Sequence, residues 1–177
     1  MSITGVHHIA YRCRDAKKTV DFYTQALGLP FTMAMSEDRV PTTGAHCPYM
    51  HIFFALGNGS HLAFFDLPEE APMQLDPNTP PWVQHIALEV KDAEALDEAI
   101  ALLRANGVEP IGPVDHAIFK SIYFHDPDGH RVEITYRTET PDAISRLTEV
   151  ARPMLEEWDA THQVSTQAAW VHDGLHK

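Results

Sequence analysis

The chain has 177 residues, a net charge of −12, an apolar fraction of 44% and a charged fraction of 21%. These values are typical of a globular chain that is long enough for one domain with a hydrophobic core. The acidic balance argues against nucleic acid or an anionic membrane as a ligand, because both require a surplus of Lys and Arg. The apolar runs are too short to cross a bilayer, and the first residues lack the regions of a signal peptide, so we expect a cytoplasmic protein.

Two segments of the chain, residues 7–29 and 84–108, begin alike. Each has His-Ile-Ala, an alternating strand pattern, Asp-Ala and then a helical pattern. Further pairs at the offset of 77 residues that joins His8 to His85 are Ala10 with Ala87 and Asp15 with Asp92. The two aspartates are predicted N-caps, and Gly28 and Gly107 are predicted helix stops. The pattern predicts a duplicated module, although two unrelated strand–helix units would read the same way.

Short apolar strands follow each predicted helix. They are "YMHIFFAL", "HLAFFDL", "SIYFHD" and "HRVEITY", with turns at residues 57–59 and 126–129. We therefore predict an α+β fold in which two paired βαβββ modules form one curved, barrel-like mixed sheet.

The predicted domain covers residues 1–137, with modules at about 3–67 and 82–137. A segment rich in Pro and acidic residues, residues 67–81, reads as the loop that joins them. Residues 138–177 form a predicted helical extension, because their apolar residues recur at helical spacing. Pro153 should kink or restart that helix.

Three strand residues point to a metal site. Side chains two apart on a strand share a face, so the opening strands of both modules would present His8 and His85 to one cavity. Glu133, between two apolar residues in the last strand, would face the same cavity. Two imidazoles and one carboxylate form the facial triad that binds non-haem Fe(II), and Mn(II) suits the same ligands. Ala63 occupies the place that corresponds to Glu133 in the first module, so a fourth protein ligand is missing.

Each of these residues also has an ordinary structural interpretation. A strand histidine taken alone is more often a hydrogen-bonded structural residue than a ligand. A strand glutamate is more often exposed at a sheet edge. His7 competes with His8 as a ligand, but strand alternation would turn it to the other face, and the repeat aligns it with Gln84.

The segment "VDHAIFKSIYFHDPDGHRVE", residues 114–133, resembles the active-site signature of type I extradiol dioxygenases. The signature positions are Val114, His116, Ile122, Tyr123, Asp126, Pro127, Gly129 and Glu133. The opening of the chain is similar to the first strand and helix of the vicinal oxygen chelate superfamily, which includes glyoxalase I, bleomycin-resistance proteins and these dioxygenases. The similarity covers about residues 3–137. With two modules, the chain resembles the one-domain members.

The resemblance implies an Fe(II)-dependent dioxygenase that cleaves the ring of a catecholic substrate with O₂. Glu133 resembles the carboxylate ligand of that family. His116 and Tyr123 resemble the histidine and tyrosine near the bound substrate, and His61 lies near a family histidine that handles protons. Expected partners are a small aromatic diol, O₂ and a second copy of the chain, because such sheets leave edges that a homodimer could cover.

Two other functions remain open on the sequence. A glyoxalase-type isomerase, lyase or resistance enzyme would commonly need a fourth ligand, which Ala63 cannot supply. A protein that only sequesters an aromatic ligand would need no metal ligands at all. Fold alone does not decide between these functions.

Overall fold

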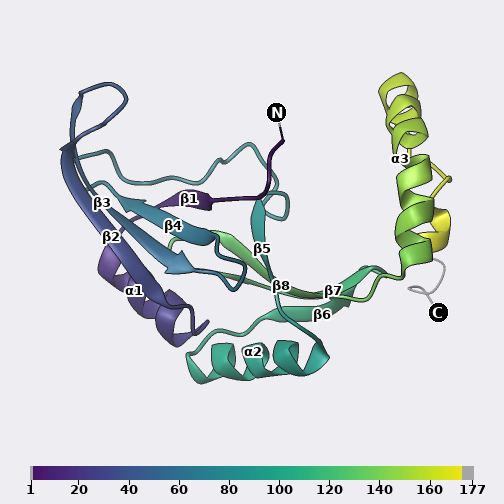
Figure 1. Cartoon of the computed structure of the whole chain (residues 1–177), viewed down its shortest axis with the longest axis horizontal. Helices are drawn as coiled ribbons and strands as arrows, with labels where there is room; N and C mark the ends of the chain where they lie inside the picture. The colour runs from purple at the N-terminus through teal and green to yellow at the C-terminus, as the bar shows by residue number, and fades with distance from the viewer. Residues whose placement is uncertain (1, 173–177) are drawn as a thin grey trace. The chain divides into compact units, whose positions relative to one another are not determined.

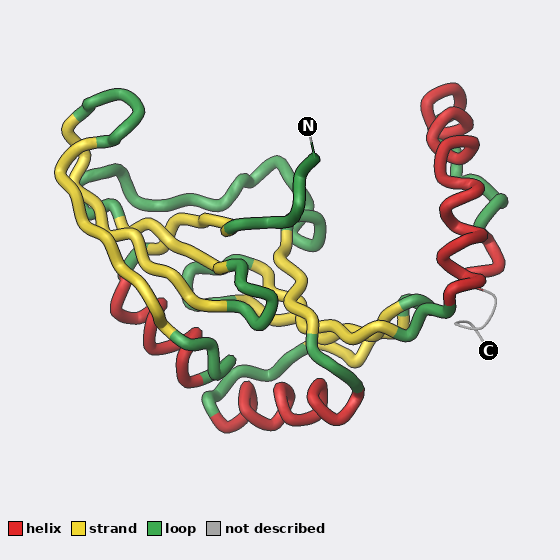
Figure 2. Tube along the Cα trace, viewed as in Figure 1, coloured by secondary structure: helices red, strands yellow, loops and turns green. Residues whose placement is uncertain are grey.

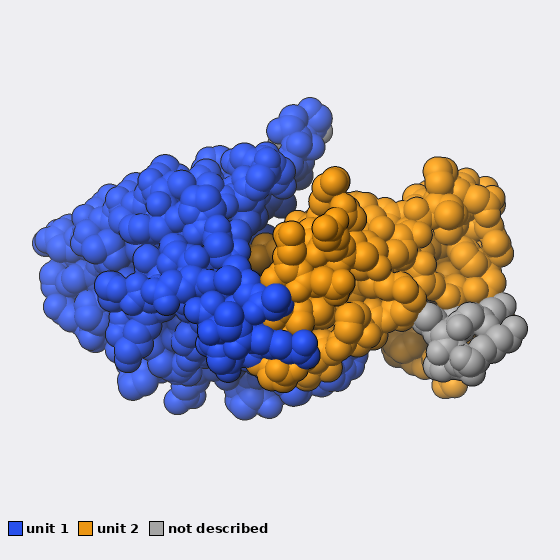
Figure 3. All heavy atoms as spheres, turned by 90° about the horizontal axis from the view of Figure 1, so that it is seen from below, with its two compact units in different colours: residues 1–85, 101–108, 125–131 blue, residues 86–100, 109–124, 132–177 orange. Residues whose placement is uncertain are grey.

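The computed structural model describes residues 2–172 of the chain. Its elements follow the order β-α-β-β-β twice, and a long helix and a short 3-10 helix follow. The chain divides into two compact units (Figure 3). Unit 1 comprises residues 1–85, 101–108 and 125–131, and unit 2 comprises residues 86–100, 109–124 and 132–177.

The first module forms a four-stranded sheet with one helix, all within unit 1 (Figure 1). Its elements are β1 His8–Cys13, α1 Ala16–Gln25, β2 Phe31–Arg39, β3 His46–Ala55 and β4 His61–Asp66. The strand order is β1-β4-β3-β2, with β1 parallel to β4 and the other pairs antiparallel. The parallel pairing places His8 beside His61 and Ala10 beside Ala63.

Helix α1 begins and ends as the sequence predicts. The Asp15 carboxylate accepts a hydrogen bond from the backbone N–H of Lys18 at 3.0 Å. After the helix, Gly28 takes a φ of +65°, a conformation that a residue without Cβ adopts at little cost. On the buried side, the ring of Tyr23 lies 5.2 Å from Phe54 and 4.9 Å from Phe64, centroid to centroid. This face of the sheet is therefore the core of unit 1, and strand alternation turns His51 and His61 to the other face.

The second module repeats the arrangement. Its elements are β5 His85–Glu89, α2 Ala93–Ala105, β6 Ile111–Asp115, β7 Phe119–His125 and β8 Arg131–Arg137. The strand order, β5-β8-β7-β6, matches that of the first sheet position by position. Asp92 caps α2 through a hydrogen bond from Ala95 N at 3.1 Å, and Gly107 takes a φ of +77° after it. The duplicated module and both predicted caps are confirmed.

The α+β class and the C-terminal helix are also confirmed. The eight strands are hydrogen-bonded as two four-stranded sheets and do not form a closed barrel. The assignment of residues 1–137 to one domain stays a prediction.

The segment between β4 and β5 is a loop, as its composition predicts (Figure 2). Helix α3, Pro141–Thr161, runs through Pro153 without a restart and has no buried residue. Its apolar residues Ile144, Leu155 and Trp158 keep 41%, 61% and 51% of their surface exposed. The short 3-10 helix, Ala169–His172, follows. Among residues 2–172, no helix combines the length and apolar character that crossing a membrane requires.

Candidate functional site

One face of the first sheet carries histidines on three neighbouring strands. His8 of β1 and His61 of β4 are register partners. On β3, His51 stacks on Phe65 with ring centroids 3.6 Å apart, and its ring lies 6.1 Å from that of His8. Nδ1 of His61 and Nε2 of His51 are buried with no hydrogen-bond partner in the described chain. Unpartnered buried nitrogens are uncommon, so this face is a candidate binding surface.

Burial also affects the protonation of His51. Its pKa is lowered, first by desolvation and then by the neighbouring His8. A lowered pKa favours the neutral imidazole, which can accept a hydrogen bond.

His7 contacts His8 directly. Their Nδ1 atoms lie 2.8 Å apart, and the ring of His7 lies 6.4 Å from that of His61. The expectation that strand alternation turns His7 away from His8 is therefore wrong. The physical reason is that β1 begins at His8, so His7 precedes the strand and does not follow its alternation.

His85 opens β5 as His8 opens β1. Its Nδ1 lies 2.9 Å from the carbonyl oxygen of Val83. A carbonyl can only accept, so Nδ1 of His85 carries the proton and Nε2 is the nitrogen suited to a metal ion.

Glu133 is buried in unit 2, at 3% exposure. The hydroxyl of Ser121, on β7, donates to its carboxylate. The same hydroxyl lies 2.9 Å from the hydroxyl of Thr135. A carboxylate is costly to bury unless it is hydrogen-bonded, paired or bound to a metal. The prediction that Glu133 points inward, and not to solvent at a sheet edge, is consistent with this burial.

His116 and Tyr123 form a pair in unit 2. His116 lies in the tight connection between β6 and β7, where its ring stacks on Phe119 with centroids 4.7 Å apart. Its Nε2 lies 2.8 Å from the hydroxyl of Tyr123. Ser121 and Tyr123 are two residues apart on β7, so they share a face of the strand. The structure therefore joins two of the residues that the signature identifies.

The predicted residues thus fall into two groups. His8, His61 and His85 belong to unit 1, and the others, His116, Tyr123 and Glu133, belong to unit 2. Within residues 2–172, no three or more His, Cys, Asp or Glu side chains are grouped so that they could hold a metal ion. Each predicted ligand has the donor chemistry that a divalent ion needs, and the assignment of the three as one ligand set remains a proposal.

The Asp-Pro-Asp-Gly part of the signature has a structural role. Asp126 accepts a hydrogen bond from the Tyr23 hydroxyl at 3.0 Å. Asp128 accepts one from the backbone N–H of Arg14 at 2.9 Å and one from the Thr19 hydroxyl at 3.2 Å. Burial raises the pKa of Asp126, and burial together with Asp126 raises the pKa of Tyr23 well above 10. The turn between β7 and β8 is thereby fixed to α1 within unit 1.

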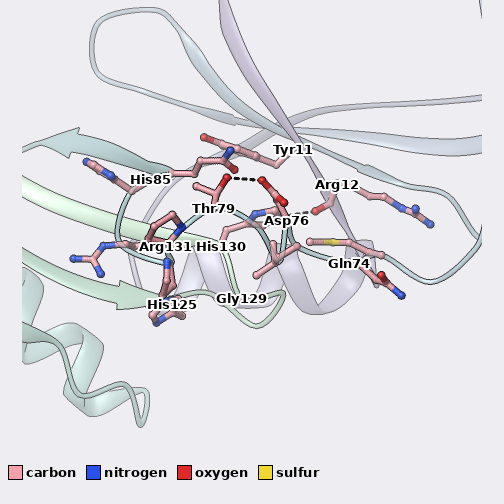
Figure 4. A pocket seen from close by; sticks show the side chains of 15 residues that line it. Tyr11, Arg12, Gln74, Asp76, Thr79, His85, His125, Gly129, His130 and Arg131 are labelled. Carbon is pink, nitrogen blue, oxygen red and sulfur yellow. Dashed lines mark hydrogen bonds between the residues drawn. The ribbon is translucent and has the colours of Figure 1, made fainter. Parts of the chain in front are cut away.

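A pocket of about 500 Å³ opens in unit 1 (Figure 4). The loop between the modules forms one wall, where the Thr79 hydroxyl donates to Asp76. Tyr11 and His130 line it with rings 4.9 Å apart, and His85 is another of its lining residues. Sequence reasoning did not find this pocket, because its walls come from segments that are far apart in the chain.

Residues 5–134 match the model of the Glyoxalase/Bleomycin resistance protein/Dioxygenase superfamily. The chain belongs to this superfamily. A putative ring-cleaving dioxygenase, MhqA of Bacillus subtilis, is 28% identical over 138 residues, which are 76% of this chain and 41% of MhqA. The chain therefore spans less than half the length of that relative. A lactoylglutathione lyase of Escherichia coli O157:H7 is 26% identical over 137 residues, 72% of this chain and 88% of that enzyme.

Solved structures support the same assignment. A glyoxalase/dioxygenase from Nostoc punctiforme has a TM-score of 0.56 and 28% identity, covering 77% of this chain and 92% of the other. FosX, a fosfomycin resistance protein from Listeria monocytogenes, has a TM-score of 0.57 and 23% identity. The match covers 81% of this chain and 99% of the FosX chain. That FosX structure contains Mn(II), so divalent metal binding occurs within the superfamily. Because relatives include ring-cleaving dioxygenases and lyases, the superfamily does not fix the reaction.

Sequence reasoning did not find three residues that the structure places next to predicted ones: His51, Ser121 and, as a neighbour of His8, His7. For Ser121 a signal was available, because it is a polar residue two positions before Tyr123 on an apolar strand. His51 gave a similar signal in "YMHIFF", where one imidazole interrupts an apolar run.

Proposed function

We propose that the protein is an Fe(II)-dependent extradiol-type dioxygenase that cleaves the ring of a catecholic aromatic substrate with O₂. His8, His85 and Glu133 would hold the metal, and Mn(II) could replace iron in the same ligand set. When bound, the metal would polarise the two adjacent substrate oxygens and hold substrate and O₂ together. The similarity to MhqA supports a ring-cleaving reaction.

The observation that carries the proposal is the hydrogen bond between His116 and Tyr123. A catechol site needs hydrogen-bonding groups that orient two hydroxyl groups, and here an imidazole nitrogen and a phenol hydroxyl lie 2.8 Å apart. The buried carboxylate of Glu133 lies on the strand next to β7 in the sheet, where the dioxygenase signature requires a ligand. His116 and Tyr123 would donate hydrogen bonds to substrate oxygens as negative charge develops there.

His61 is the proposed acid–base residue. Its Nδ1 is buried without a partner, and it is the register neighbour of His8. An imidazole with a buried nitrogen next to a metal ligand can move a proton where water is excluded. His61 would take a proton from the substrate hydroxyl and return it to oxygen later in the reaction.

A glyoxalase-type isomerase, lyase or resistance enzyme is the second candidate. The similarity to a lactoylglutathione lyase favours it. Ala63, which is fully buried on β4 and has no donor atom, disfavours a four-ligand site. A protein that only binds an aromatic ligand is the third candidate, and three intact ligand residues disfavour it. The homodimer and the cytoplasmic location stay predictions.

The decisive experiment is an anaerobic titration. Protein loaded with Fe(II), or with Mn(II) in a parallel sample, is titrated with catechols that carry different substituents, and air is then admitted. We expect O₂ uptake and a coloured semialdehyde-type product. A separate assay with the hemithioacetal of glutathione would detect thioester formation. Metal-loaded protein that forms the thioester and cleaves no catechol would replace the dioxygenase with the lyase.

A further inference from the structure

The two predicted histidine ligands engage their Nδ1 atoms in different ways. Nδ1 of His85 lies 2.9 Å from a backbone carbonyl, that of Val83. Nδ1 of His8 lies 2.8 Å from another imidazole nitrogen, Nδ1 of His7. In both cases the ring is held through Nδ1, and Nε2 is the nitrogen that a metal ion would approach. A hydrogen bond at the second ring nitrogen commonly orients a metal-bound histidine.

The pair of imidazoles has one arrangement that leaves His8 able to bind through Nε2. Two Nδ1 atoms 2.8 Å apart share one proton, so one nitrogen donates and the other accepts. If His8 donates, its Nε2 carries a lone pair and can bind a metal. If His7 donates, the neutral form of His8 carries its proton on Nε2 and cannot.

His7 is itself held in place by the sheet. Its carbonyl oxygen accepts a hydrogen bond from the backbone N–H of His61 at 3.0 Å. Its ring packs edge-on against His8, with centroids 5.1 Å apart. The start of β4 therefore fixes the backbone of the residue that contacts the predicted ligand.

We propose that His7 is a positioning residue for His8: Nδ1 of His7 accepts the Nδ1 proton of His8 and so directs Nε2 of His8 to the metal ion. This inference rests on the proposed function, because it requires His8 to be a ligand. It concerns metal affinity and ligand orientation, and His7 itself takes no part in the bond-breaking steps.

Two substitutions of His7 distinguish the loss of its hydrogen-bond acceptor from the loss of its side-chain volume. His7→Ala removes the acceptor. His7→Asn places an amide oxygen close to the former Nδ1 position, and this oxygen can accept the same proton. His46→Ala is the matched control, because His46 is also an exposed histidine of unit 1 and lies at the start of β3.

Metal affinity is measured by anaerobic titration with Mn(II) and with Co(II), whose visible spectrum reports the geometry around the ion. His7→Ala should bind about 10–100-fold more weakly, the range found for partners of metal ligands. His7→Asn should recover most of that loss, and His46→Ala should match the unchanged protein. Thermal unfolding of the metal-free variants should stay the same, since both histidines are exposed.

The outcomes distinguish this inference from the proposed function. If the unchanged protein binds neither ion, the proposed function fails. If it binds them and His7→Ala binds equally well, the positioning role fails and the proposed function stands. If His7→Ala abolishes binding as completely as His8→Ala and His7→Asn gives no recovery, His7 is a ligand and the positioning role is wrong.

Discussion

The last strands of the two modules, β4 and β8, occupy the same place in their sheets and differ in chemistry. Each pairs next to the opening strand of its own module. On β4 the side chains that share a face are those of His61, Ala63 and Phe65. On β8, Glu133 lies at the position that corresponds to Ala63, and it is buried beside Ser121.

This difference shows how a duplicated scaffold can give an asymmetric site. In the proposed ligand set, each module supplies one histidine at the start of its opening strand, and only the second supplies a carboxylate. A three-residue ligand set leaves more coordination positions for substrate oxygens and O₂ than a four-residue set does. The substitutions below test whether the two modules are as unequal in chemistry as β4 and β8 suggest.

The largest effect is expected at Glu133. Glu133→Gln keeps the shape of the side chain and removes its charge. The affinity for Fe(II) should therefore fall by more than about 10²-fold, which exceeds the loss typical of residues that only hydrogen-bond a metal ligand. Glu89→Gln is the control: Glu89 lies on β5 of the same sheet, is half-exposed and pairs with Arg137. Metal content by atomic absorption decides the matter, and unchanged iron in Glu133→Gln would show that the ligand set is wrong.

The next effect is expected at His61, the proposed acid–base residue on the first module. His61→Phe should retain metal and lose about 10²–10⁴ in turnover, the usual contribution of one such group. Rapid mixing should show that steps after O₂ addition slow more than catechol binding. His46→Phe serves as the control. Loss of metal from His61→Phe would make His61 a ligand, and full turnover would remove it from the site.

The His116–Tyr123 pair on the second module should act as one unit. Each single change, His116→Phe or Tyr123→Phe, should lower turnover by about 10²-fold or more and leave metal content unchanged. Because the two side chains are hydrogen-bonded, the double variant should lose little beyond either single variant. Additive losses would show that they act independently.

The smallest effect is on stability and concerns Tyr23. Tyr23→Phe removes the hydrogen bond to buried Asp126, so the free energy of unfolding should fall by about 1–3 kcal/mol. The folded pKa of Tyr23 is raised, so its contribution is present below about pH 10 and is lost as the pH rises above that value. Urea unfolding at about pH 8 and about pH 10.5 should show this loss in the unchanged protein and a smaller one in Tyr23→Phe.

Much of the fold was predictable because the residues at the helix ends mark the same boundaries as the hydrophobic pattern. Asp15 and Asp92 cap their helices, and Gly28 and Gly107 follow them with positive φ. Strand β2 was missed because its apolar alternation, at Phe31, Met33 and Met35, stops halfway and is followed by the polar run Ser-Glu-Asp-Arg, and all nine residues are exposed. An edge strand of this kind is recognised by its pairing with β3, which sequence patterns do not show.

The site was predictable only in part. The spacing of His116, Tyr123 and Glu133 in one segment identified residues that the structure places on adjacent elements of one sheet. The contact of His7 with His8 could not be predicted from alternation, because it depends on where the first strand begins. The pocket in unit 1 depends on the loop between the modules, whose path no periodicity specifies.

The hydrogen bond between Tyr23 and Asp126 joins residues 103 positions apart. A ribosome adding about 5–20 residues per second would have completed the whole first sheet several seconds before Asp126 is made. Until then the buried hydroxyl of Tyr23 lacks the carboxylate that accepts its hydrogen bond, whereas the hydroxyl of Thr19 can already donate to the carbonyl oxygen of Asp15. The first module by itself should therefore be less stable than it is in the whole protein, although its own strand pairing is complete, and the nascent chain would be more exposed to proteases and chaperones during that interval.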